Sequence, residues 1–187
     1  MYYNDMNVSI TEAFAPQVGL INRALIVTPE AAIPFMKLSG GNAKKELETY
    51  LTANTKTAPL LVKAVDLATT QADTSGNAII PDYVYVCGAV VATWETATDV
   101  SALTNLIEAN TTVESDFWGI IPVDYNAKFM EWAVGFCNAK AKGLFIDIEA
   151  KNFTMDNLKK SSRIYAVYNG RTVYQSNQQL FEINTYD

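Results

Sequence analysis

The chain has 187 residues, of which 49% are hydrophobic and 11% aromatic, so it is long and apolar enough to bury one substantial core. Its formal net charge is −6, and its lysines and arginines occur singly or in pairs, which argues against an electrostatic nucleic-acid binder. The sequence contains no histidine, so the commonest zinc ligand and the commonest acid–base catalyst are missing.

A polar segment opens the chain. Within residues 1–12, Met6, Val8 and Ile10 alternate with polar residues, which is the pattern of a half-buried strand. No neighbouring segment is an obvious partner, so these residues are predicted to form either an edge strand of their own sheet or an arm that adds to another subunit's sheet. The segment lacks the basic start and apolar centre of a signal peptide, which favours a soluble protein made in the cytoplasm.

Apolar runs and helical periodicity then divide the body of the chain into alternating strands and helices. The predicted elements, in chain order, are a strand at 20–27, helices at 42–53 and 59–68, a strand at 83–86, a helix at 100–109, a strand at 117–121, a helix at 126–141, strands at 144–146 and 164–168, and a return strand at 172–174. Pro59 is favourable in the first turn of a helix, and Thr98 or Asp99 can cap the helix that follows them. Residues 34–41 and 69–77 are predicted loops.

Residues 116–147 form the clearest unit. An apolar strand ends at Pro122, a long helix follows, and Gly143 is predicted to close that helix before a second apolar strand. A parallel strand that is buried on both faces reads as a continuous apolar run, as both of these strands do. The sequence therefore predicts an α/β fold with a mainly parallel sheet flanked by helices.

The last part of the chain shows two further strand signals. Asn169–Gly170 is a strong hairpin-turn signal, so residues 172–174 are expected to pair back onto residues 164–168. Residues 178–187 alternate like a strand and again have no visible partner. The predicted organisation is an N-terminal arm at 1–14, an α/β domain at 15–175 and a C-terminal arm at 176–187. The expected arm anchors are Met6, Val8, Ile10, Leu180, Phe181 and Ile183.

Candidate chemistry is sparse. Asp124, Asp147 and Glu149 follow predicted strands, where α/β folds place active sites, and three converging carboxylates would suit a magnesium ion. The alternative is that Asp124 caps the long helix and the other two are loop residues. Residues 39–42, with sequence SGGN, form either an anion site at a helix N-terminus or a simple turn. The two cysteines lie in apolar segments and are predicted to be buried thiols, not a disulfide or metal ligands.

The order of several segments resembles a known family. These segments are the early strand MNVSI, the strands GLINRALIV and PDYVYV, the run DFWGIIPVD, and the helix NAKFMEWAVGFCNAKAK leading to GLFID. Their order, over roughly residues 6–170, is similar to the N-terminal half of the contractile tail sheath proteins of bacteriophages and related injection systems. Sheath subunits are usually much longer, so the resemblance implies a minimal sheath-like protein, a fragment, or a shortened relative.

The resemblance also implies a function. Sheath subunits form hexameric rings stacked into a tube, and their terminal arms donate strands to neighbouring subunits. The expected role is therefore structural, without a cofactor, with tail tube and baseplate proteins as partners and with no nucleic acid or membrane. The expected location is the virion tail, after assembly in the host bacterial cytoplasm. A small metal-dependent enzyme that uses Asp124, Asp147 and Glu149 and another tail or neck component are the alternatives.

Overall fold

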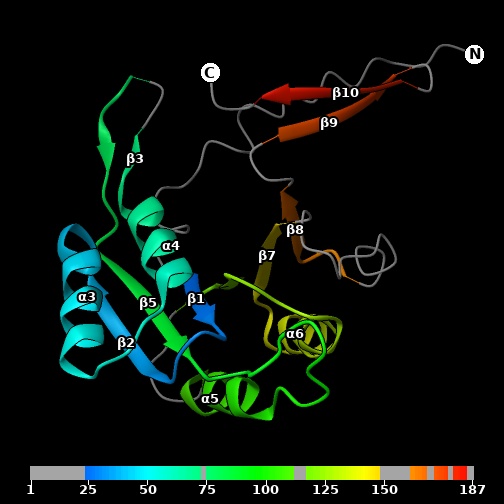
Figure 1. Cartoon of the computed structure of the whole chain (residues 1–187). Coiled ribbons are helices and arrows are strands. Elements are labelled where there is room, and N and C mark those ends of the chain that lie inside the picture. The colour runs from blue at the N-terminus through cyan, green and yellow to red at the C-terminus, as the bar shows by residue number, and fades with distance from the viewer. Residues whose placement is uncertain are drawn as a thin grey trace, which may run out of the picture.

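A six-stranded sheet forms the centre of the computed structural model, which describes residues 24–72, 75–111, 117–147, 161–167, 171–176 and 179–184 (Figure 1). The strand order is β2-β5-β1-β6-β7-β8. These strands are β1 (Ala24–Thr28), β2 (Ile33–Ser39), β5 (Tyr83–Gly88), β6 (Gly119–Pro122), β7 (Gly143–Asp147) and β8 (Ile164–Val167). All neighbouring pairs are parallel except β2 with β5, which is antiparallel. The predicted α/β fold with a mainly parallel sheet is confirmed.

Helices cover the sheet from both sides (Figure 1). Two of them, α3 (Ala43–Ala53) and α4 (Pro59–Thr69), pack on β2 and β1, while α5 (Ser101–Thr111) packs on β2 and β5 and α6 (Ala127–Lys140) packs on β7. Successive residues of β1 enter different cores: Leu25 and Val27 join the cluster with α5 and α6, and Ile26 joins the cluster with α3 and α4. Every residue of β1 is buried, which explains its uninterrupted apolar sequence.

The long helix α6 begins and ends with specific caps. Asn126 is its N-cap, and the Asn126 side chain accepts a hydrogen bond from the backbone N–H of Phe129 at 2.8 Å. At the other end Ala141 adopts the left-handed conformation, with φ of 54°, and the N–H of Lys142 donates to the carbonyl of Cys137. The prediction that Gly143 closes the helix is therefore wrong, because Gly143 is already the first residue of β7.

Residues 34–41, predicted as a loop, form most of β2 and the first two residues of the short 3₁₀ turn η1 (Gly40–Asn42). Pro34 suggested a loop because proline cannot donate to a sheet ladder. In the structure β2 is an edge strand, and Pro34 falls within a register shift between Ile33 and Met36, where the ladder with β5 is interrupted. A proline is tolerated at such a position. The predicted loop at 69–77 also contains a strand, β3 (Gln71–Ala72), which pairs with β4 (Ala78–Ile79) directly after the loop.

The C-terminal strands pair differently from the prediction. β8 joins the main sheet beside β7 in parallel, and it does not pair with the residues that follow Asn169–Gly170. Instead β9 (Arg171–Ser176) and β10 (Gln179–Asn184) form an antiparallel two-stranded sheet of their own. Ile164 packs against the core formed with α5 and α6, and this burial favours the parallel position over a hairpin. The C-terminal segment, predicted to lack a partner, therefore has one within the chain.

Candidate functional site

The sheet has the connectivity of a doubly wound fold. Its parallel strands run in the order β5-β1-β6-β7-β8, so the chain leaves β1 to one side, through β5, and later returns to the other side at β6. In such sheets ligands bind at the carboxyl ends of the strands where this reversal occurs. That point lies between β1 and β6.

Two of the three predicted carboxylates reach this edge of the sheet. Asp124 follows β6, and Asp147 is the last residue of the neighbouring strand β7. Glu149 lies outside the described residues. Asp124 Oδ1 accepts a hydrogen bond from the N–H of Tyr125 at 2.8 Å. Within the described parts of the chain, no group of three or more histidine, cysteine, aspartate or glutamate residues is placed to hold a metal ion.

Backbone hydrogen bonds tie the loops together at the reversal point. The N–H of Val123, after β6, donates to the carbonyl of Val27 at 2.9 Å, and the N–H of Ala89, after β5, donates to the carbonyl of Thr28 at 3.1 Å. A third bond at 3.1 Å runs from the N–H of Val91 to the carbonyl of Pro29. The residues after β6 and β5 are thus bonded to the end of β1, and the Val91 bond joins the loops after β5 and β1, where a doubly wound enzyme would hold its ligand.

Glu30, the acidic residue nearest the end of β1, caps a helix. Its carboxylate accepts hydrogen bonds from the N–H groups of Leu60 and Leu61, both at 3.1 Å, in the first turn of α4. Thr28 Oγ1 donates to the same carboxylate at 3.0 Å and accepts from the Glu30 N–H at 3.2 Å. A negative side chain is favourable at a helix N-terminus. Leu60 and Leu61 lie 30 and 31 residues after Glu30, so no local sequence pattern predicts this cap.

The helix-capping role considered for Asp124 belongs to Asn126. The Asn126 side chain is 2% exposed, and besides capping α6 it donates through Nδ2 to the carbonyl of Ala97 at 2.9 Å. This second bond ties the loop before α5 to the start of α6. Asp99 caps α5 as predicted, because its Oδ1 accepts from the Ser101 N–H at 2.8 Å and from the Ser101 hydroxyl. These two hydrogen bonds lower the pKa of Asp99 below its ordinary value.

Both cysteines are buried free thiols, as predicted. Burial raises the pKa of Cys87 to about 12. Burial also raises the pKa of Cys137 to about 12, although the charges of Lys142 and Arg163 act in the opposite direction. A thiol with such a pKa carries almost no thiolate at neutral pH, so neither cysteine is activated as a nucleophile.

Residues 39–42 form a packed turn, as the simpler interpretation predicted. Gly40 lies against residues 81–82, and a Cβ atom at this position would be 1.4 Å from the carbonyl oxygen of Pro81. The N–H of Gly40 donates to the carbonyl of Asp82 at 2.9 Å, and the N–H of Ser39 donates to the carboxylate of Glu46 at 3.0 Å. The backbone donors at the start of this turn are therefore engaged within the protein.

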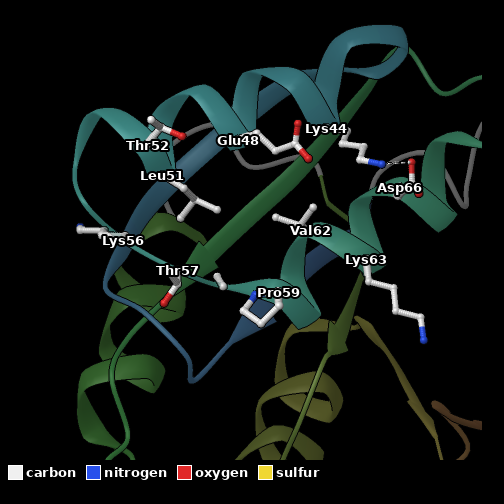
Figure 2. A pocket seen from close by; sticks show the side chains of 11 residues that line it. Lys44, Glu48, Leu51, Thr52, Lys56, Thr57, Pro59, Val62, Lys63 and Asp66 are labelled. Carbon is white, nitrogen blue, oxygen red and sulfur yellow. Dashed lines mark ion pairs between the residues drawn. The ribbon is translucent and has the colours of Figure 1, made fainter.

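An open groove separates α3 from α4 (Figure 2). Leu51 and Val62 point into the gap between the two helices, and an ion pair of 3.2 Å between Lys44 and Asp66 spans the two helices. Both charged side chains are more than two-fifths exposed, so the pair contributes little to stability. The apolar lining and exposed charges of the groove are typical of a surface between two packed helices. They do not form the arrangement of side chains that a catalytic site requires.

The predicted arm anchors fall in two places. Met6, Val8 and Ile10 lie outside the described residues. Leu180, Phe181 and Ile183 lie on β10, at the register positions opposite Gln175, Tyr174 and Thr172 of β9. The sheet order leaves β2 and β8 as the two edges of the main sheet.

The comparisons with known proteins found no match. No family model, no curated protein and no solved structure matches this chain. In the described part of the chain, no helix is both long enough and apolar enough to span a membrane.

Proposed function

We propose that this protein is a structural subunit of a phage-like contractile tail sheath, which self-assembles into rings or a helical tube by strand exchange through its terminal segments. The observation that carries the proposal is the ribbon formed by β9 and β10, which pairs with no third strand among the described residues. An isolated two-stranded ribbon is marginally stable in water, and three or more strands are needed for independent stability. A strand from a neighbouring subunit would supply the third strand that the ribbon lacks.

The carboxyl edge of the main sheet also supports a structural role. Its loops are fastened by backbone hydrogen bonds, and the Glu30 carboxylate caps α4. The Glu30 carboxylate is thus engaged in holding α4, which supports a structural role for this residue. In a sheath the work is mechanical: subunits shift relative to one another while backbone hydrogen bonds between exchanged strands keep neighbours tethered. The partners would be further copies of the chain, a tail tube and a baseplate.

Replacing the apolar anchors of the N-terminal segment tests the proposal. In the triple variant Met6→Ser, Val8→Ser and Ile10→Ser, the apolar side of the predicted strand is lost, so polymers seen by electron microscopy should disappear. The matched control changes the alternate positions, Asn7→Ala, Ser9→Ala and Thr11→Ala, and should polymerise like the unmodified chain. Both variants should keep the melting temperature of the unmodified monomer. Polymers of the serine variant, or unfolding of its monomer, would contradict the arm role.

A metal-dependent enzyme is the second candidate, because Asp124 follows β6 and Asp147 is the last residue of the adjacent strand β7. A thermal-shift titration with Mg²⁺ and Mn²⁺ separates the two functions, since a ligand that binds the native state raises its melting temperature. The sheath proposal predicts no shift. A saturable rise that is lost in Asp147→Asn would favour the enzyme.

A further inference from the structure

The two edges of the main sheet differ in how they are protected. Edge strands expose unpaired backbone groups and therefore invite pairing with another chain, unless proline, charge, a bulge or very short length prevents it. β2 has seven residues and carries the first three protections: Pro34, the exposed Lys37, and the register shift between Ile33 and Met36. β8 has the sequence IYAV, with no proline, lysine or acidic residue. Within the described chain it pairs only with β7. The β8 edge is thus the open edge of the sheet.

The register of β8 shows which backbone groups are available. The N–H of Leu144 in β7 donates to the carbonyl of Arg163 at 2.8 Å. Successive residues of a strand direct their backbone groups to alternate sides, so Tyr165 faces β7 like Arg163. The N–H and carbonyl groups of Ile164 and Ala166 therefore point away from the sheet. The open edge offers one donor and one acceptor at each of two positions, with Tyr165 between them.

A row of aromatic side chains ends at this edge. Trp118 contacts Phe145 edge to face with ring centroids 4.8 Å apart, and Phe145 stacks on Tyr165 at 4.8 Å with an interplanar angle of 6°. The row lies on the face of the sheet opposite Ile120, Leu144 and Ile164, which pack into the core with α6. Tyr165, the last member of the row, is 44% exposed. An aromatic partner placed beyond Tyr165 would continue the row.

We propose that a second copy of the chain pairs with this edge, β8 against β8, antiparallel across a two-fold axis that passes beside Tyr165. In this register Ile164 of each copy exchanges both backbone hydrogen bonds with Ala166 of the other, so every outward group described above is satisfied. Tyr165 lies opposite Tyr165 of the second copy at the closely spaced, non-hydrogen-bonded position. The two aromatic rows then join on one face of a continuous sheet.

Self-complementarity is the reason for choosing a second copy as the occupant. A two-fold contact uses the same patch on both subunits, and a residue at its centre meets its own equivalent. The strand places its donors and acceptors symmetrically about Tyr165, and aromatic pairs facing each other across antiparallel strands are favourable. Because β8 has only four residues, the contact is small and the dimer is expected to form reversibly with concentration. This inference does not rest on the proposed sheath function.

Disulfide trapping tests the register. In Tyr165→Cys the two Cα atoms would be about 4.5 Å apart, which lies within the range that a disulfide spans. Mild oxidation of the full chain should give a covalent dimer that a reducing agent reverses. The control is Leu67→Cys on α4, a more accessible position because Leu67 is 54% exposed against 44% for Tyr165, and it should remain monomeric. The native thiols do not interfere, because Cys87 and Cys137 are buried. Equal cross-linking of the two variants, or none with Tyr165→Cys, would overturn the proposal.

A charge-pairing experiment tests the symmetry. Like charges directly opposite one another on antiparallel strands are destabilising, so Tyr165→Lys and Tyr165→Glu should each sediment as monomers at concentrations where the unmodified chain dimerises. An equimolar mixture of the two should regain the dimer, because lysine then faces glutamate across the axis. Circular dichroism checks that both variants are folded. An unmodified chain that stays monomeric at every concentration, or a mixture that stays monomeric, would overturn the proposal. So would dimerisation of the lysine variant alone, since another segment would then occupy the edge.

Discussion

The two halves of the main sheet are built differently. The half formed by β2, β5 and β1, here called the covered half, has α3 and α4 packed on one face and α5 on the other. The half formed by β6, β7 and β8, here called the open half, has α6 on one face. On its other face Phe145 and Tyr165 belong to neither buried cluster of the described residues. Helices therefore enclose both faces of the covered half, whereas on the second face of the open half only Ile121 of β6, among the described residues of its strands, packs against the α3/α4 cluster.

Adjacent residues of β7 give the sharpest test of this difference. Leu144 is fully buried against α6, and Phe145 lies on the other face, partly exposed. Leu144→Ala should lower the free energy of unfolding by about 2–5 kcal/mol, as expected for a buried leucine. Phe145→Ala should cost less than the ~3–5 kcal/mol of a buried phenylalanine. Urea denaturation of both variants measures the difference. If Phe145→Ala lost more unfolding free energy than Leu144→Ala, the face of the sheet that carries Phe145 would be covered as well.

Two glycines test how rigid each half is. In the covered half, the Cβ of Gly40→Ala would overlap the backbone oxygen of Pro81, which cannot move alone, so a loss of about 3 kcal/mol is expected. In the open half, the Cβ of Gly119→Ala would lie 2.7 Å from Phe145 Cε2. That ring lies at a partly exposed face and can shift, so the loss should be nearer 1 kcal/mol. Equal losses of unfolding free energy would indicate that both sites are equally confined.

Removing the cap of α4 should cause a smaller loss of unfolding free energy than the core substitutions. Glu30→Ala removes the acceptor for the N–H groups of Leu60 and Leu61, and should cost about 1 kcal/mol, typical of losing a helix cap. Glu48→Ala, at an exposed residue that lines the α3/α4 groove, is the matched control and should change stability by less than about 0.5 kcal/mol. Chemical denaturation compares the two. If both variants behaved alike, the cap would contribute nothing measurable.

Asp99 gives the smallest expected effect, seen as a pH dependence. Its pKa is lowered in the folded protein by hydrogen bonds from Ser101, so its contribution to stability is present above the unfolded pKa and fades as the pH falls through the folded pKa. In Asp99→Asn the side chain no longer titrates, and the drop in melting temperature between pH 6 and pH 3 should be slightly smaller than in the unmodified chain. An unchanged or steeper drop would contradict the capping role.

Local sequence signals predicted the elements whose causes are local. The continuous apolar runs of β1, β6 and β7 identified buried parallel strands, and Pro59 marked the first residue of α4. The buried state of both cysteines followed from their apolar neighbours. In each case the residues that determine the feature lie within a few positions of one another, so hydrophobic periodicity and local turn residues were sufficient to predict it.

Features that depend on distant partners were not predicted. β2 was missed because Pro34 reads as a loop unless the position of the strand at the sheet edge is known. The turn signal at Asn169–Gly170 suggested a hairpin, but burial of Ile164 beside β7 determined the pairing of β8. The carboxylate site was only partly predictable: topology places Asp124 and Asp147 at one edge, whereas the engagement of Glu30 with α4 depends on residues 30 positions away.

Negative-stain electron microscopy of the purified 187-residue chain across a concentration series is the most direct test of the sheath proposal. Rings or tubes should form above a threshold concentration, because terminal strands that need a partner would find it on neighbouring copies. A chain that remains monomeric at every concentration, and that does not polymerise on an added tail tube or baseplate, would contradict the sheath proposal.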